Sequence, residues 1–274
     1  MARVPADSNA DEGSSHLAQD LVQAIERDQF FLVYQPTIDL QTNAFAGVEA
    51  LIRWRHPSRG VLGPRSFIEE LESSSQIIPV GRWTLQTACV QGAAWHDRGY
   101  RFSVSVNVSQ QQFESSTFFD DVADALFSSR FDASLLVLEF AQATLTVDRE
   151  ASVSRLTKLR TLGVRFAIDD FEPGSSALDE LGEFPIDIVK LDREFIAGLA
   201  NSSEASSLVH RLVERSETRH LQVIAAGVED SEQRAQLQNE KVHVGQGYLF
   251  SRPHEADEID RFLEDFAIFS GKPL

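Results

Sequence analysis

Short apolar runs recur along the chain, and most of them end on a polar side chain. Runs of four to six residues rich in Val, Ile and Phe indicate buried strands. They predict strands near residues 30–35, 45–53, 102–108, 135–140, 164–170, 186–192, 221–227 and 243–250. Helical patterns cover residues 66–76, 79–98, 117–129, 148–162, 203–217, 230–240 and 256–268. This alternation is typical of an α/β fold, a TIM-type (β/α)8 barrel, with the helices packed outside the strands.

The first two predicted strands depart from the alternation. Only the turn residues Asp39–Asn43 separate them, whereas a crossover between parallel strands needs about a dozen residues or more. We therefore expect these two strands to pair as an antiparallel hairpin. The fold class predicted for the chain is a modified (β/α)8 barrel with one antiparallel strand.

Polar residues stand within or at the end of seven of the apolar runs. They are Glu49, Asn107, Glu139, Asp169, Asp170, Lys190, Glu229 and Gln246. The carboxyl ends of barrel strands meet at one face, where the active sites of such barrels are assembled. Acids, amides and a lysine gathered at that face predict a metal-and-phosphate site, or the remains of one. Any single acid among them could instead be a solvated residue of the barrel rim.

The chain organises as one domain. Its 274 residues fit one barrel of about 250 residues. Residues 1–16 lack periodicity and predict a disordered segment, and residues 17–270 form the barrel domain. Within it, Leu17–Asp28 has one apolar helical face and predicts a docking helix. The single Cys89 excludes an intramolecular disulfide, and its helical spacing predicts a packing residue.

Charge and hydropathy limit the partners. The formal net charge of −17 argues against a nucleic acid polymer or an anionic membrane as the main partner. An anionic ligand must therefore be held locally, by cations or by metal. No apolar stretch approaches the roughly 20 residues of a membrane span, and the N-terminus lacks the apolar run of a signal peptide. We expect a cytoplasmic protein.

Six segments of the chain together resemble a known family. They are Tyr34–Pro36, Glu49–Pro57, Val106–Ser109, Asp169–Phe171, Lys190–Arg193 and Gln246–Pro253. In order and spacing they resemble the motifs of the EAL domain, from about residue 17 to about residue 266. That family hydrolyses the bacterial messenger cyclic di-GMP to linear pGpG, and its fold is a barrel with one antiparallel strand. The resemblance thus implies a barrel with one antiparallel strand, the fold that the short connection between the first two strands also predicts.

The resemblance also assigns roles to residues. It implies a first Mg²⁺ or Mn²⁺ held by Glu49, Asn107, Glu139 and Asp169, with Asp169 and Asp170 reaching toward a second ion. Such hard ions prefer oxygen ligands, and two of them about 4 Å apart activate water and phosphoryl oxygens. Lys190 would orient the attacking water, and Glu229 is the retained member of a pair of catalytic glutamates. The residues expected to hold the nucleotide are Gln35, Glu49, Leu51, Arg53, Asp170 and Gln246.

Three departures from the family pattern fall on the side of the second metal. Ala226 stands where the family motif Ala-Glu-Gly-Val-Glu has its first glutamate. Glu172 and Pro173 replace a Gly-Thr pair in the loop after Asp170, which removes a flexible glycine and fixes a φ angle. Gln142 replaces a glutamate that braces this loop. The residues for the first metal and the phosphate-binding Arg53 match the family.

Three functions therefore remain open. The first is a degenerate domain that binds cyclic di-GMP, with hydrolysis lost or weak. The second is a metal-dependent phosphodiesterase with residual activity, and the third is a protein-interaction module on the same scaffold. The number of metal sites retained, one or none, stays open as well, as do a homodimer and a protein partner.

Overall fold

The computed structural model of the chain describes residues 17, 20, 21, 23–174, 181, 182, 184–199 and 202–270, with side chains as far as residue 265. The predicted disordered segment 1–16 lies outside the described residues. Part of the altered loop, residues 175–180, also lies outside them.

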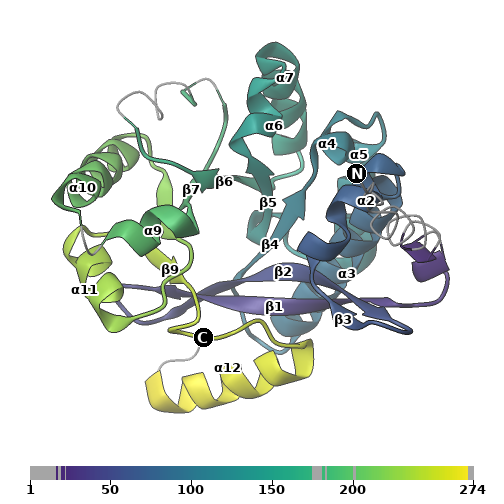
Figure 1. Cartoon of the computed structure of the whole chain (residues 1–274), viewed down its shortest axis with the longest axis horizontal. Coiled ribbons are helices and arrows are strands. Elements are labelled where there is room, and N and C mark those ends of the chain that lie inside the picture. Colours follow the sequence, from purple (N-terminus) through teal and green to yellow (C-terminus); the bar gives the residue numbers. More distant parts are fainter. Residues whose placement is uncertain are drawn as a thin grey trace, which may run out of the picture.

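Strands close into a barrel at the centre of the molecule (Figure 1). In chain order the barrel strands are β1 (Phe30–Asp39), β2 (Phe45–His56), β4 (Ser103–Val108), β5 (Leu136–Ala141), β6 (Arg165–Phe171), β7 (Ile188–Leu191), β8 (Gln222–Ala225) and β9 (Val244–Gln246). From β2 through β9 each neighbouring pair is parallel. A further short strand, β3 (Gly60–Leu62), pairs only with β2 in the described sheet. The predicted α/β barrel is confirmed.

Strand β1 is the inverted one. It pairs antiparallel with β2 on one side and with β9 on the other, and so closes the barrel. The β1–β2 register places Gln35 opposite Glu49, and the β1–β9 register places Thr37 opposite Gln246. The predicted hairpin is confirmed, and its register brings three predicted site residues to neighbouring positions.

Helices surround the barrel (Figure 1). They are α2 (Ile68–Ser73), α3 (Ile77–Asp97), α4 (Gln110–Glu114), α5 (Phe118–Ser129), α6 (Gln142–Thr146), α7 (Arg149–Arg160), α9 (Arg193–Leu199), α10 (Ser203–Thr218), α11 (Ser231–Asn239) and α12 (Ala256–Ser270). Two 3-10 turns, η1 (Pro64–Ser66) and η2 (Ala133–Leu135), precede α2 and β5. None of the helices in the described ranges offers an apolar stretch that could cross a bilayer.

The last strand is shorter than predicted. β9 ends at Gln246, whereas the apolar run continues to residue 250. Beyond Gln246 the backbone turns, because the amides of Phe250 and Ser251 both donate to the carbonyl of Gly247. The apolar residues of this turn pack against the core without extending the sheet.

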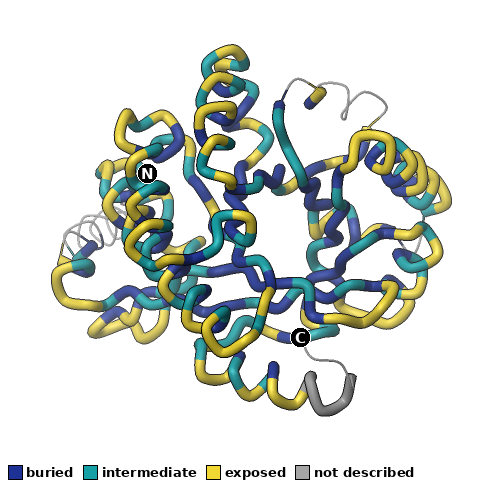
Figure 2. Tube along the Cα trace, turned by 180° about the vertical axis from the view of Figure 1, so that it is seen from behind, coloured by how far each residue is buried: buried dark blue, intermediate teal, exposed yellow. Residues whose placement is uncertain are grey.

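Burial follows the layered arrangement. The strands and the inner faces of the helices are buried, and the outer faces of the helices are exposed (Figure 2). A second core cluster joins Leu17, Leu21 and Ala24 to Trp54 and Phe67. The described residues of the N-terminal segment thus pack against the barrel, as predicted.

Cys89 is fully buried on the inner face of α3. Burial raises the pKa of its thiol to about 12, so almost no thiolate forms at neutral pH. We expect the folded protein to resist a thiol-specific reagent such as dithionitrobenzoate and the protein in urea to react at once. The measurement is absorbance with time at pH 8, with and without urea. Rapid labelling of the folded protein, at a rate unrelated to unfolding, would contradict the packing role of this cysteine.

Candidate functional site at the carboxyl ends of the strands

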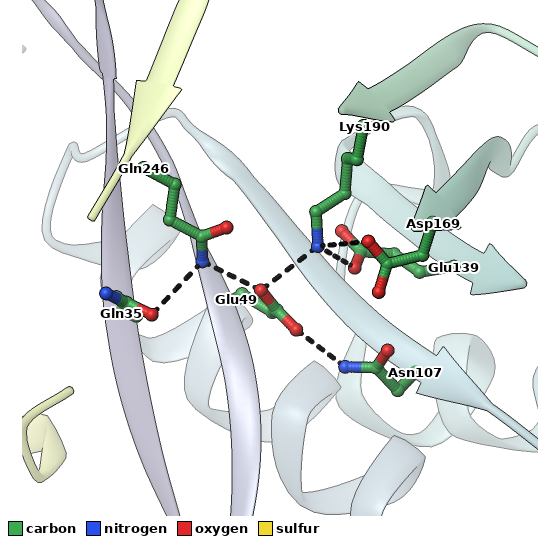
Figure 3. Close-up of polar contacts among 7 residues, drawn as sticks. All are labelled: Gln35, Glu49, Asn107, Glu139, Asp169, Lys190 and Gln246. Carbon is green, nitrogen blue, oxygen red and sulfur yellow. Dashed lines mark hydrogen bonds and ion pairs between the residues drawn. The ribbon is translucent and has the colours of Figure 1, made fainter. Parts of the chain in front are cut away.

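A buried lysine lies at the centre of the strand ends (Figure 3). The Nζ atom of Lys190, on β7, lies 2.5 Å from a carboxylate oxygen of Glu139 on β5. It lies 3.1 Å from Glu49 on β2 and 3.3 Å from Asp169 on β6. Four strands thus contribute one ammonium group and three carboxyl groups, as expected of the carboxyl face of a barrel.

Glu49 links this cluster to the amides. One of its carboxylate oxygens accepts a hydrogen bond of 2.6 Å from Asn107, at the end of β4. The other accepts one of 2.7 Å from Gln246, which also donates to Gln35 over 3.4 Å. With Lys190, three groups donate to the Glu49 carboxylate and hold it in one orientation. The structure therefore brings together seven of the predicted site residues (Figure 3).

One ammonium group cannot neutralise three carboxylates in a buried site. Burial opposes ionisation of Glu49, but the Lys190 charge and the hydrogen bonds from Gln246 and Asn107 outweigh it, and the pKa of Glu49 is lowered. Burial dominates at Glu139, and the charges of Glu49 and Asp169 add to it. The pKa of Glu139 rises to about 8 even though Lys190 opposes the shift. The pKa of Lys190 lies well above its usual value, because the attraction of three acids exceeds the effect of burial. Of the two glutamates bonded to Lys190, Glu139 is thus the one whose ionised form the site disfavours.

This cluster predicts a pH dependence of the metal-free protein. The pKa of Glu139 in the folded state, about 8, exceeds the unfolded value of about 4.3. Its contribution to stability is therefore complete at low pH and is lost as the pH rises toward 8. With EDTA present, Glu139→Gln should gain stability relative to the parent between pH 5 and pH 8. Urea denaturation at a series of pH values measures the difference, with the exposed Glu26→Gln as control. A stability difference between Glu139→Gln and the parent that stays constant with pH would contradict the raised pKa of Glu139.

A groove opens beside the cluster. It has a volume of about 530 Å³ and is lined at one end by Asn107, Glu139, Asp169 and Asp170. Its other walls are largely apolar and come from β2 and from the helices α2 and α3, through Leu51, Ile68, Ile77 and Val80. Apolar walls with a few polar groups at one end are typical of sites for small ligands. Leu51 was predicted here from the sequence, whereas the α2 and α3 residues were not, because they form ordinary amphipathic patterns.

Asp170 has an unusual backbone conformation. Its φ of +52° lies in the left-handed region, which non-glycine residues adopt rarely. Burial and the neighbouring charges of Asp169 and Asp192 raise its pKa. Conformations of this kind persist where the surrounding structure holds them, often at functional sites. The turn directs successive residues Asp169 and Asp170 to the groove.

Four of the predicted site residues make no hydrogen bond or ion pair to the lysine cluster within the described part of the chain: Leu51 and Asp170, which line the groove, and Arg53 and Glu229. Arg53 is half-buried on the same face of β2 as Glu49 and Leu51, and its guanidinium donates to the Ile52 carbonyl over 2.8 Å. Glu229 is exposed and forms a 2.6 Å ion pair with Arg193. Gly227 makes room for that pair, because its φ is +75° and a Cβ there would overlap the Arg193 side chain. Arg193, the last residue of the Lys190–Arg193 segment, had been assigned no role from the sequence.

The three departures follow three different strands of the barrel, β5, β6 and β8. Ala226 follows β8 and borders a pocket of about 170 Å³ together with Gln35, Arg193 and Gln246. Glu172 is exposed and Pro173 is buried at the start of the altered loop. Gln142 begins α6, directly after β5. Because residue 226 is an alanine, its side chain ends at Cβ and offers no carboxylate to this pocket.

A family model described as the EAL domain matches residues 18–253. The chain belongs to the EAL domain family. It is 36% identical over 253 residues to the bifunctional diguanylate cyclase/cyclic di-GMP phosphodiesterase MucR of Pseudomonas aeruginosa, covering 92% of this chain and 37% of MucR. It is 34% identical over 250 residues to the cyclic di-GMP phosphodiesterase PdeR of Escherichia coli, covering 91% of this chain and 38% of PdeR. The chain thus spans less than half the length of these two relatives.

The fold of this EAL domain agrees with that of a relative solved with its ligand. The structure of PaMucR phosphodiesterase in its c-di-GMP complex superposes with a TM-score of 0.84 at 36% identity. The match covers 89% of this chain and 99% of that one. The names of MucR, PdeR and the solved PaMucR complex all refer to cyclic di-GMP.

EAL domains are generally dependent on Mg²⁺ or Mn²⁺. In the described part of this chain, no three His, Cys, Asp or Glu side chains are arranged as ligands of one ion. Lys190 occupies the space between Glu49, Glu139 and Asp169, and acts as their counter-charge. The donor set nevertheless fits one hard divalent ion by its chemistry, because it consists of carboxylate oxygens and the Asn107 amide oxygen.

Proposed function

We propose that this EAL domain binds cyclic di-GMP and hydrolyses it to pGpG slowly or not at all. One observation carries the proposal. The carboxyl, amide and lysine groups beside the groove are complete and mutually bonded, whereas position 226 offers only a methyl group. The domain therefore keeps the groups that would bind one ion and a phosphate, and lacks one that would organise hydrolysis.

Binding is supported by the residues that remain. The groove of about 530 Å³ provides apolar walls against which a base can pack. Arg53 has no acidic side chain within ion-pair distance among the described residues, so its guanidinium is available for a charge-assisted bond to phosphate. Gln35 and Gln246 hold their amides beside Glu49, where they can orient a bound nucleotide.

A bound Mg²⁺ or Mn²⁺ would supply electrophilic stabilisation of the phosphate. Glu49, Asn107, Glu139 and Asp169 would hold it. Lys190 would compensate part of the negative charge of these acids. Loss of a group that orients a metal typically lowers affinity or activity by about 10–100-fold, and loss of a direct ligand should lower it more.

Residual phosphodiesterase activity is the second candidate. It is favoured by the convergence of Glu49, Glu139 and Asp169 on a single centre, which a pure binding module does not need. A protein-interaction module without nucleotide binding is the third. The difference between the three lies in two measurable properties, affinity for cyclic di-GMP and its turnover.

Calorimetric titration tests the proposal. Cyclic di-GMP should bind the domain, and Mg²⁺ or Mn²⁺ should tighten binding through the four metal-binding residues. The heat trace should lack the slow continuous signal of turnover. Absence of binding under all conditions would leave only the interaction module, and continuous heat from hydrolysis would favour the phosphodiesterase.

Arg53→Ala should weaken cyclic di-GMP binding by about 1.5–3 kcal/mol, the range for a hydrogen bond to a charged group. Arg53→Lys should lose less, because it keeps the charge but not the two-pronged geometry. The exposed Arg59→Ala, in the turn after β2, is the matched control. The same calorimetric titration measures all three variants. Equal affinity of Arg53→Ala and the parent for cyclic di-GMP would show that Arg53 does not contribute to binding.

A further inference from the structure

The barrel contains a second polar cavity, at the opposite end from the groove. This chamber has a volume of about 320 Å³. Its floor is formed by residues at the amino ends of strands, Ser103 of β4, Arg165 of β6 and Gln222 of β8. Its roof is formed by Glu49, Glu139, Lys190 and Gln246. It lies within the barrel and shares the roof residue Glu139 with the groove.

Small polar side chains leave this space open. The interior of a (β/α)8 barrel is usually filled by layers of bulky branched residues. Here Thr37, Ser103 and Ser105 stand in the lining, and bulky residues such as Ile188 and Val244 cover only part of the wall. At about 30 Å³ per molecule, the chamber has room for roughly ten waters or for a small hydrated solute.

Arg165 gives the floor a positive charge. Its guanidinium donates over 3.3 Å to the side-chain oxygen of Gln222, and no acidic side chain lies within ion-pair distance of it among the described residues. The acids of the roof, Glu49 and Glu139, are both bonded to Lys190. A partly buried guanidinium that faces a polar cavity without a carboxylate partner favours an anion beside it.

Further donors surround Arg165. Because the oxygen of Gln222 accepts from Arg165, the NH₂ group of that amide remains a donor. The hydroxyls of Thr37 and Ser105 line the same chamber and make no hydrogen bond to another residue within the described part of the chain. Arg165 and Gln222 are both only half-buried, so the floor reaches solvent. A fixed cation, an amide and hydroxyls around an accessible cavity match the needs of an oxyanion.

We propose that this chamber binds a small oxyanion of the size of phosphate or sulfate, held by Arg165 with Gln222 and the chamber hydroxyls. The chamber shares only its roof residues Glu49 and Gln246 with the predicted nucleotide contacts, and its floor residues Arg165 and Gln222 are not among them. It can be tested whether or not the domain binds or hydrolyses cyclic di-GMP.

The test is a titration of the domain with inorganic phosphate at constant ionic strength, with chloride as the reference salt. Proton–nitrogen NMR should show saturable shifts of the Arg165 Nε and the Gln222 side-chain amide. Arg165→Met should weaken phosphate binding by about 10-fold or more, as expected for loss of a charged hydrogen bond. The exposed Arg59→Met should retain the parent affinity for phosphate at this site.

Gln222→Met provides a second variant that keeps the Arg165 charge and should bind phosphate several-fold more weakly. If circular dichroism shows that Arg165→Met does not fold, Gln222→Met alone tests whether the chamber binds phosphate. Absence of saturable shifts in the parent up to about 50 mM phosphate, well above the millimolar range of weak specific binding, would overturn the proposal. Unchanged phosphate affinity in the folded Arg165 or Gln222 variant would also overturn it.

Discussion

Lys190→Met should destabilise the domain by about 3–5 kcal/mol at pH 7 without divalent ions. This is the usual cost of removing one partner from a buried ion cluster. Lys190 lies within 3.3 Å of three carboxyl groups, and only 3% of its surface is exposed. Methionine keeps the length of the side chain, so the loss is that of the charge and its hydrogen bonds.

Two further results should accompany this loss. The variant should recover stability as the pH falls, because acids that lose their counter-charge have raised pKa values and are stabilised when protonated. It should also recover stability on addition of Mn²⁺, which can replace the ammonium group as counter-charge. Urea denaturation measures both effects, with the exposed Lys241→Met expected to stay within about 0.5 kcal/mol of the parent. A Lys190→Met variant as stable as the parent would contradict the central role of this lysine.

Restoring the family residues at the four altered positions should raise Mn²⁺-dependent hydrolysis of cyclic di-GMP by about 100-fold or more, the reverse of the loss expected when a metal-organising group is removed. The repaired protein combines Ala226→Glu with Gln142→Glu, Glu172→Gly and Pro173→Thr. The pocket of about 170 Å³ beside Ala226 provides space for the longer side chain. Ala226→Glu alone should recover little, because the loop residues 172 and 173 and Gln142 remain altered.

The repaired set requires its own control. Replacing Ala226→Glu by Ala226→Gln in the combination supplies the same shape without the negative charge, and should abolish the gain. Groups that act as a unit are non-additive, so the combined effect should exceed the product of the separate effects. Chromatographic separation of pGpG from cyclic di-GMP measures each rate. A repaired protein that binds nucleotide and metal but stays inactive would show that the defect lies outside these four positions.

The fold and the gathering of the site residues could be predicted because both follow from local patterns. Apolar runs indicate strands, and parallel strands place their carboxyl ends at one face, which is where Asn107, Glu139, Asp169 and Lys190 meet. The short first connection likewise required an inverted β1.

Other features depend on contacts that no local pattern contains. The bond from Gln246 to Glu49 and Gln35 follows from the register of β1, which shifts between Thr37 and Ile38. The short helix α4 is too brief to show a period and is stabilised by a capping box at Ser109. Arg165 and Gln222 are single polar residues at strand starts, so only the closed barrel reveals that they face one chamber.

Co-elution of the nucleotide with the protein distinguishes binding of cyclic di-GMP from its rapid turnover. The domain is incubated with cyclic di-GMP and Mn²⁺ for several hours and passed through a gel-filtration column, and the nucleotide that elutes with the protein is identified by chromatography. The proposed function predicts intact cyclic di-GMP in the protein peak. Complete conversion to pGpG, or a protein peak without nucleotide, would contradict it.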